Sequence, residues 1–331
     1  MRVAALDLGS NSFHLLVADA SPGGLETVVR AKEMLRLGSV VAAQGRLGDA
    51  AIEGATRAAA GLVQVARAHG ADRLTVCGTD VLRRAPDGPR LAQAVGAVAG
   101  VEVRILTGEE EAGLIFEAVT ARMGLGDEPV LAADLGGGSL ELMVGGGAGL
   151  SWACSLPLGV ARLTAEEVGD DPPSAADVRR LRAAVMRRLE PHLLPIRQRA
   201  PVRAVGTSGT LLTLIGLAAA DRRSGGRGEG ATPALPGEQG VAHLSQLARL
   251  QRRLVSLDHA GRQALPGVDP RRADLLPAGA VCCVTLLECA GLDSITGCDW
   301  SLREGMILRT YRGAGAPAGR ALAIEPGAAG G

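Results

Sequence analysis

Aromatic residues and lysine are scarce in this 331-residue sequence. Two phenylalanines, two tryptophans and one tyrosine are too few to build a platform on which the bases of a nucleic acid could stack. Lys32 is the only lysine, which excludes a Walker-type phosphate loop with its Gly-Lys-Ser/Thr sequence. The formal net charge is zero. We therefore expect neither a nucleic-acid polymer nor a membrane as a partner.

The sequence also lacks common motifs for metal binding, secretion and membrane insertion. The six cysteines show no CxxC spacing and the five histidines form no HExxH motif, so we expect free thiols in a reducing compartment. The acidic residue Asp7 comes too early in the sequence for the apolar core of a secretion signal to precede it. The longest apolar stretch, residues 278–292, contains Glu288 and is too short to cross a bilayer. These absences predict a cytoplasmic location.

The most informative feature that is present is a segment that occurs twice. Residues 7–17 read DLGSNSFHLLV and residues 134–144 read DLGGGSLELMV, each after an apolar run. This pattern is typical of a strand, a tight glycine-rich turn and a returning strand, and consecutive N–H groups in such a turn can bind an anion. In either copy alone, the glycines could simply allow the tight turn, without any role in binding an anion. The repeat predicts two similar halves, and the predicted phosphate-binding residues are Gly9, Ser10, Asn11, Ser12, Gly136, Gly137, Gly138 and Ser139.

The order of predicted elements indicates an α/β protein with two domains, each a mixed sheet covered by helices. The segment GLGDEP at 124–129 is the best boundary, which gives domains at 1–125 and 126–312. Residues 241–265 are expected to be helical. Residues 222–240 are rich in Gly, Pro, Arg and Ser and predict a mobile insertion, and residues 313–331 predict a disordered tail.

Three acids fall close to the repeated turns. Asp7 and Asp134 end predicted buried strands, where an unpaired carboxylate is unfavourable. Glu141 lies on the same face of its strand as Ser139 because side chains alternate along a strand. Asp134 and Glu141, with Asp7 as a further candidate, therefore predict a Mg²⁺ site completed by substrate phosphate. The alternative is that Glu141 is solvated and Asp134 caps the turn.

A glutamate-rich segment, residues 107–111, opens a predicted helix. Thr107 and Glu110 have the spacing of a capping box. Glu111 lies one turn before Ile115 and thus on the apolar face, where a carboxylate is a candidate general base. Alternatively, Glu111 is a further acid that complements the helix dipole.

A third glycine-containing segment, GTSGT at 206–210, follows a predicted strand and precedes a helix. It is a candidate anion site at a helix N-terminus, with Gly206, Thr207 and Ser208 as the binding residues, or simply a capped junction. Arg83 and Arg162 could reach a polyanion, although an arginine at either position could equally lie at the surface.

Together these segments resemble the exopolyphosphatase and guanosine pentaphosphate phosphohydrolase (Ppx/GppA) family, in its short two-domain form. The resemblance covers about residues 2–312 and rests on the two DLG segments, GTDVLRRA, GEEEAGLIF, LPLGVARLT, AVGTSGTL, LPAGA and CDWSLREG. It implies the fold of the actin-like ATPase superfamily: two similar actin-like (ribonuclease H-like) domains, each a mixed sheet flanked by helices, with a cleft between them.

The resemblance also implies roles for individual residues. Glu111 matches the glutamate that activates the attacking water, and Arg83 matches an arginine that holds the phosphate chain. Asp134 and Glu141 match acids near the phosphate and a Mg²⁺ or Mn²⁺ ion. Members of the family often carry arginine two residues after the catalytic glutamate, where this sequence has Gly113. A homodimer is implied as well.

The activity implied is hydrolysis of a phosphoanhydride. We expect an exopolyphosphatase that removes the terminal phosphate from linear, short-chain polyphosphate. A phosphohydrolase acting on guanosine pentaphosphate (pppGpp) is the nearest alternative, because both substrates present a terminal phosphoanhydride. A small-molecule kinase of the same fold and a non-catalytic polyphosphate or nucleotide sensor are the alternatives of another class.

Overall fold

The computed structural model describes residues 1–220 and 238–315. The first sheet begins with the N-terminal copy of the repeated segment. The strands β1 (Arg2–Leu8), β2 (Ser12–Ser21) and β3 (Gly24–Met34) form an antiparallel meander. On the other side of β1, β4 (Arg73–Gly78) and β5 (Val103–Ile105) add in parallel, giving the order β3-β2-β1-β4-β5.

The second sheet repeats this plan and adds one strand. Its order is β10-β11-β9-β6-β7-β8, in which β6, β7 and β8 form the antiparallel meander and β9 and β11 add in parallel. The expected architecture of two mixed sheets flanked by helices is therefore confirmed. The strands are β6 (Val130–Leu135), β7 (Leu140–Gly146), β8 (Gly149–Leu156), β9 (Arg203–Thr207), β10 (Glu238–His243) and β11 (Ser294–Cys298).

One sequence-based expectation is wrong at the edge of this sheet. Residues 241–265 were expected to be helical, but β10 runs to His243 and pairs antiparallel with β11. Helix α9 (Leu244–Ser256) begins only after it. The short segment before α9 gains its hydrogen bonds from a strand that lies some fifty residues later in the chain, and a local pattern does not contain that partner.

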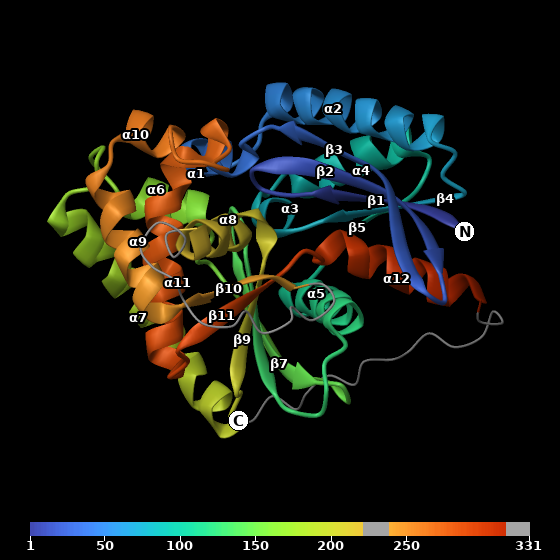
Figure 1. Cartoon of the computed structure of the whole chain (residues 1–331). Coiled ribbons are helices and arrows are strands. Elements are labelled where there is room, and N and C mark those ends of the chain that lie inside the picture. The colour runs from blue at the N-terminus through green and yellow to red at the C-terminus, as the bar shows by residue number, and fades with distance from the viewer. Residues whose placement is uncertain (221–237, 316–331) are drawn as a thin grey trace, which may run out of the picture.

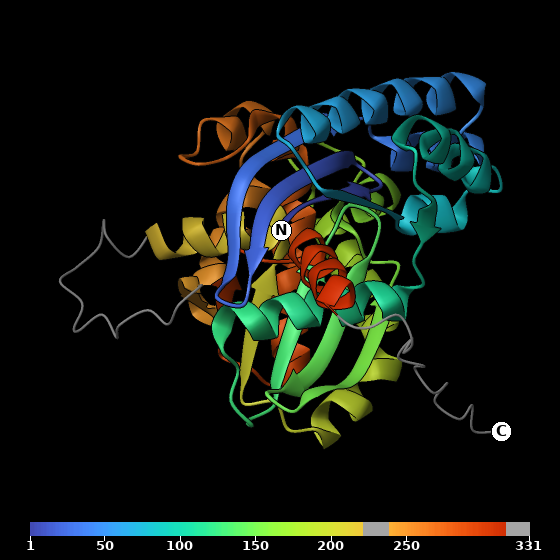
Figure 2. The same cartoon turned by 90° about the vertical axis from the view of Figure 1, so that its right-hand side faces the viewer.

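The helices form three layers around the two sheets (Figures 1 and 2). Helices α2 (Asp49–Ala68) and α4 (Gly88–Ala99) cover the outer face of the first sheet. On the outer face of the second sheet lie α7 (Ala175–Gln198), α8 (Ser208–Ala220), α9 and α11 (Leu276–Ala290). Shorter helices are α1 (Leu37–Gln44), α3 (Asp80–Arg84), α6 (Val160–Glu167), α10 (His259–Gln263) and the 3-10 turn η1 (Pro270–Leu275).

The middle layer consists of α5 (Gly108–Met123) and α12 (Leu302–Gly315), which pack against each other between the sheets. Helix α12 packs on β1 and β2 of the first sheet, whereas α5 packs on β7 and β8 of the second. Each helix thus lies on the sheet formed by the other half of the chain. The core cluster around them joins both halves into one body.

The predicted domain division stays a prediction. Residues 124–129 form the connection between α5 and β6. Most of the predicted insertion at 222–240 lies outside the described residues. The predicted tail at 313–331 also lies mostly outside them, and α12 continues to Gly315.

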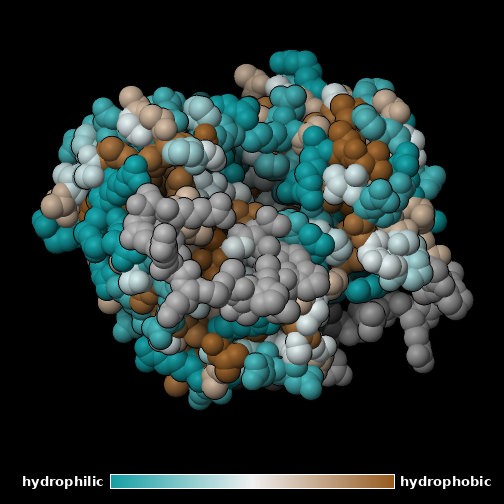
Figure 3. Space-filling view, in the orientation of Figure 1, coloured by the Kyte–Doolittle hydropathy of each residue, from teal (hydrophilic) through white to brown (hydrophobic). Residues whose placement is uncertain are grey.

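The stretch Pro270–Ala290 is the one described helical segment that is long and apolar enough to cross a membrane. Of its most apolar window, 78% is buried inside the protein, where α11 packs against α7, α8 and α9. This is the position of a core helix. The face seen in Figure 3 is largely hydrophilic, with hydrophobic residues in small groups.

Candidate active site

The two repeated turns face each other across the middle of the molecule. At Gly138, an added Cβ would lie 2.0 Å from Asp80 Oδ2 and 2.6 Å from Ser10 Oγ. At Gly137, it would lie 3.1 Å from the Cβ of Asn11. The second turn therefore has glycine where the first has Ser10 and Asn11, because the two turns are in direct contact.

The backbone carbonyl and amide groups of the two turns differ in their hydrogen bonding. Their carbonyl groups are used within the fold: Ser10 accepts from Gly38 N at 2.7 Å, and Gly137 accepts from Ala161 N at 3.0 Å. The amides of Ser10, Asn11, Gly137 and Gly138 donate to no group in the described part of the chain. All four residues line one cavity, and unused backbone N–H groups from two turns are donors of the kind that bind a phosphate.

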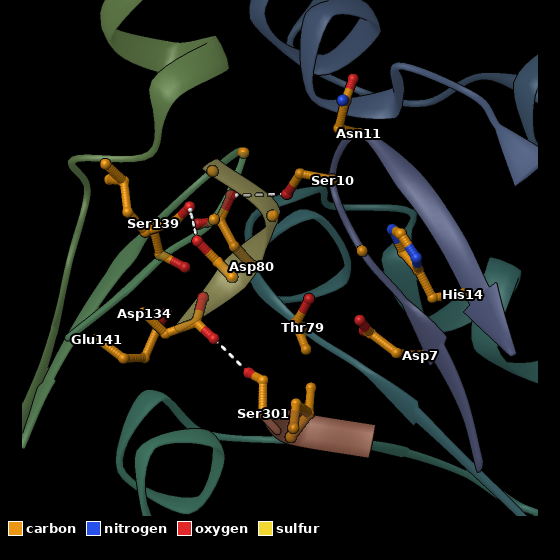
Figure 4. A pocket seen from close by; sticks show the side chains of 18 of the residues that line it. Asp7, Ser10, Asn11, His14, Thr79, Asp80, Asp134, Ser139, Glu141 and Ser301 are labelled. Atoms are coloured by element: carbon orange, nitrogen blue, oxygen red, sulfur yellow. Dashed lines mark hydrogen bonds between the residues drawn. The ribbon is translucent and has the colours of Figure 1, made fainter. Parts of the chain in front are cut away.

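That space is a cavity of about 220 Å³ (Figure 4). The side chains of Asp7, Asp134 and Glu141 point into it below the turns. Most of the residues predicted for the site line this cavity, namely Asp7, Gly9, Ser10, Asn11, Ser12, Glu111, Asp134, Gly136, Gly137, Gly138, Ser139, Glu141 and Ser208.

The register of the two hairpins places the acids. Asp134 lies directly opposite Glu141, and Asp7 lies opposite His14 at the same position of the first hairpin. Glu141 is only 1% exposed and accepts from Ser155 Oγ at 2.7 Å. The alternative of a solvated Glu141 is therefore wrong. Asp134 accepts a hydrogen bond from Ser301 Oγ.

Burial shifts the protonation of all these groups. It raises the pKa of Asp7 to about 7, although Arg303 opposes the shift. Burial, together with the charge of Asp134, raises the pKa of Glu141 to about 7. The pKa of His14 is lowered to about 3 by burial and by Arg303, so its ring is neutral.

The acids fit a cation whose shell is completed by substrate. One carboxylate oxygen of Asp7, Oδ1, is buried and has no partner among the described residues. Asp134 and Glu141 form an adjacent pair of hard oxygen ligands. Residues 1–220 and 238–315 contain no group of three or more His, Cys, Asp or Glu side chains that could hold a metal by itself. Mg²⁺ commonly binds to one or two carboxylates together with water and phosphate oxygens.

Glu111 lines the cavity from the first turn of α5. The predicted capping box between Thr107 and Glu110 is confirmed. Glu111 is buried, and its Oε2 accepts from Arg83 Nη1 at 2.7 Å. Burial and the charge of Glu141 raise the pKa of Glu111, whereas Arg83 lowers it. Arg83 does not line the cavity; its guanidinium also donates to the Leu106 carbonyl at 2.7 Å.

The third predicted segment contributes only in part. Ser208 and Gly209 line the cavity at the start of α8, and Ser208 has a φ of 82°. The structure does not bring Gly206 and Thr207 to the cavity wall. Gly206 packs against Ile295, and the hydroxyl of Thr207 donates to the Trp300 carbonyl at 2.8 Å.

Other lining residues were not singled out from the sequence. Arg272 comes from η1, and Ser301 and Arg303 come from the start of α12. Ser301 and Arg303 belong to the CDWSLREG segment, which contributed to the resemblance without a role for either residue. The remaining residues that were missed are His14, Thr79, Asp80 and Gly209, together with the apolar residues Ile115, Leu135 and Leu302.

Comparisons with known proteins agree with this geometry. The model of the Ppx/GppA phosphatase family matches residues 16–312. An uncharacterized protein of Streptomyces coelicolor is 37% identical over 313 residues, covering 93% of this chain and 90% of the relative. Exopolyphosphatase 1 of Mycobacterium tuberculosis is 33% identical over 316 residues, covering 93% and 88%.

Solved structures show the same architecture over most of the chain. An exopolyphosphatase from Cytophaga hutchinsonii has a TM-score of 0.84 at 25% identity and covers 95% of this chain and 98% of its own. The Aquifex aeolicus member of the Ppx/GppA family has a TM-score of 0.76 at 25% identity, with coverages of 96% and 99%. The expected actin-like two-domain fold and the enzyme class, a phosphoanhydride hydrolase, are confirmed. The chain therefore belongs to the Ppx/GppA phosphatase family.

Proposed function

We propose that this enzyme is an exopolyphosphatase that releases orthophosphate from the end of linear polyphosphate. The observation that carries the proposal is a cavity lined by two opposed turns and by buried carboxylates, in which four turn amides have no partner among the described residues. Exopolyphosphatases among its relatives support the same assignment. Short chains are the proposed substrate, and the cavity of about 220 Å³ accommodates the end of such a chain.

In this proposal, the terminal phosphate lies between the two turns. The amides of Ser10, Asn11, Gly137 and Gly138, the N-terminus of α8 and the guanidinium groups of Arg272 and Arg303 bind its oxygens. A Mg²⁺ or Mn²⁺ ion held by Asp134 and Glu141, with Asp7 nearby, would supply further charge stabilisation.

Glu111 supplies the general base. Its carboxylate orients a water molecule and takes one proton from it as the oxygen attacks the terminal phosphorus in line. The bond from this phosphorus to the bridging oxygen breaks, and the shortened chain leaves with that oxygen. Arg83 holds the Glu111 carboxylate in place through their 2.7 Å ion pair.

A phosphate-release assay tests the substrate. Polyphosphates of several lengths and pppGpp are compared at equal concentrations of phosphate ends. We expect the highest kcat/KM on short polyphosphate. A preference for pppGpp would make the enzyme a pppGpp phosphohydrolase. ATP-dependent phosphorylation of a small molecule would indicate a kinase, and tight polyphosphate binding without turnover would indicate a sensor.

Metal dependence is tested by chelation. We expect EDTA to abolish phosphate release and either Mg²⁺ or Mn²⁺ to restore it, because several buried carboxylates face an anionic substrate. An enzyme that is fully active in EDTA, with no divalent metal detected in the protein, would remove the metal from the proposal.

We further propose a cytoplasmic homodimer that associates through helices of the second half. Helix α7 exposes the apolar side chains of Met186 and Leu194, which are 45% and 65% accessible. Sedimentation at micromolar concentration is expected to give the mass of a dimer, and Leu194→Asp is expected to give a monomer. A wild-type monomer would contradict this proposal.

A further inference from the structure

The start of α12 brings a hydroxyl group to one of the acids of the cavity. Ser301 directly precedes α12, and its Oγ donates to Oδ2 of Asp134, which lies on β6 (Figure 4). The two residues are 167 positions apart in the sequence, and both line the cavity. The hydrogen bond engages one of the two carboxylate oxygens of Asp134, so a cation would be bound through the other, Oδ1.

The backbone on both sides of this hydroxyl is anchored. The N–H of Ser301 donates to Glu304 Oε2 at 2.9 Å, as at a capped helix start. Glu304 is only 1% exposed, and its Oε1 forms an ion pair of 3.0 Å with Arg30 on β3. The carbonyl of Trp300 accepts from Thr207 Oγ1 at 2.8 Å. The serine is therefore tied to the first sheet through Arg30 and to the second through Thr207.

Close packing also fixes the direction from which α12 approaches the cavity. An added Cβ at Gly305 would lie 2.0 Å from the carbonyl oxygen of Leu114 on α5, so the two helices are in direct contact there. Helix α5 carries Glu111 on its first turn. Because the segment around Ser301 is already ordered by these contacts, its hydroxyl loses little further conformational entropy when it holds Asp134.

The two acids of the proposed cation site are supported in the same way. Glu141 accepts from Ser155 Oγ on β8 at 2.7 Å, and Asp134 accepts from Ser301. Each carboxylate thus has a serine donor from a different element. A hydroxyl orients a carboxylate without bringing a positive charge, whereas an arginine or lysine in its place would compete with the cation. Asp7 differs, because its Oδ1 has no partner among the described residues.

We propose that Ser301 is a positioning residue for the cation site. Its hydroxyl fixes Oδ2 of Asp134 and leaves Oδ1 for Mg²⁺ or Mn²⁺, and Glu304 holds Ser301 in place through the backbone N–H. The inference rests on the proposed function insofar as it takes Asp134 to bind the metal. Groups that hydrogen-bond to metal ligands typically contribute about 10–100-fold to metal affinity or activity. Loss of this hydroxyl should therefore weaken metal binding.

Mn²⁺ binding to the substrate-free protein tests this role without any turnover. The signal of free Mn²⁺ in electron paramagnetic resonance, followed during a titration, gives the dissociation constant. Ser301→Ala is expected to bind Mn²⁺ about tenfold or more weakly. Thr310→Val is the matched control on the same helix, because its hydroxyl donates to the Met306 carbonyl and does not reach the cavity, and it is expected to keep the wild-type affinity.

A pair of variants of equal shape separates the hydroxyl from packing. Ser301→Thr keeps the donor and Ser301→Val removes it, so we expect near wild-type Mn²⁺ affinity in the first and weak binding in the second. The same pair is compared by phosphate release over a range of Mg²⁺ concentrations. Ser301→Val should need about tenfold more Mg²⁺ for half-maximal activity and should approach the wild-type kcat when Mg²⁺ is saturating.

The outcomes distinguish this role from the proposed function. Equal Mn²⁺ affinity in the wild type, Ser301→Ala and Ser301→Val would overturn the positioning role and leave the metal and the reaction in place. Equally weak binding in Ser301→Thr and Ser301→Val would overturn it too, because the hydroxyl would then not matter. A wild type that binds no Mn²⁺ would reject both the metal and this role. A wild type that binds Mn²⁺ but releases no phosphate would reject the exopolyphosphatase alone.

Discussion

Glu111 is the residue on which the proposed chemistry depends most directly. Glu111→Gln keeps the size of the side chain but removes the proton acceptor, so we expect kcat to fall by about 10²–10⁴-fold. The rate of phosphate release from polyphosphate gives kcat, and the melting temperature shows whether the variant is folded. Glu110→Gln is the matched control, because glutamine also completes a capping box, and it is expected to retain kcat. A wild-type kcat in Glu111→Gln would reject this base.

The ion pair between Arg83 and Glu111 predicts the pH dependence of the reaction. Glu111 acts when deprotonated, and burial raises its pKa, so activity is expected to fall with decreasing pH already above the usual range of a glutamate. Arg83 lowers this pKa. Arg83→Gln should therefore shift the acidic limb of the pH profile of kcat to higher pH. A profile whose acidic limb stays in place, or moves to lower pH, would contradict this coupling.

Among the structural elements, the contact between the two turns is the most sensitive to a single methyl group. Gly138→Ala places a carbon 2.0 Å from Asp80 Oδ2 and 2.6 Å from Ser10 Oγ, so these two buried side chains must move or the turns must separate. We expect a loss of about 1–3 kcal/mol in the free energy of unfolding and a higher KM. Gly113→Ala on α5 meets nothing within 4 Å and should stabilise the helix by about 0.5–1 kcal/mol. Urea unfolding gives the free energy of unfolding of both variants. An unchanged value in Gly138→Ala would show that the two turns are not in close contact.

Local patterns predicted those elements whose interactions are local. The two hairpins and the capping box of α5 involve residues close in sequence, and all are found. Arg272 and Arg303 reach the cavity from η1 and α12, more than 130 residues after the second turn. Nothing in their own segments marks them as lining a site at the end of β1. The sequence also did not predict that α5 and α12 each pack on the sheet of the other half, because this arrangement depends on tertiary packing between distant segments.

At the scale of the whole molecule, a formal net charge of zero coexists with a strongly organised centre. Buried acids and the guanidinium groups of Arg272 and Arg303 line the same cavity. Ion pairs also join the two halves of the chain, such as Lys32 Nζ to Asp269 Oδ2 at 2.9 Å. An anionic substrate thus experiences the local field of the cleft rather than the net charge of the protein.

This separation of local field from net charge predicts the effect of salt. Raising NaCl from about 0.05 to 0.3 M shortens the screening length to below about 8 Å, which weakens the attraction of partly exposed arginines for polyphosphate. We expect KM to rise several-fold and kcat to change little, because the buried carboxylates and turn amides are poorly screened. Lys32→Gln serves as the control for salt acting on the contact between the halves. One outcome would contradict this prediction: kcat of the wild type falls at high salt, and kcat of Lys32→Gln is already equally low at low salt. Salt would then act by weakening the contact between the two halves, and not by weakening substrate binding.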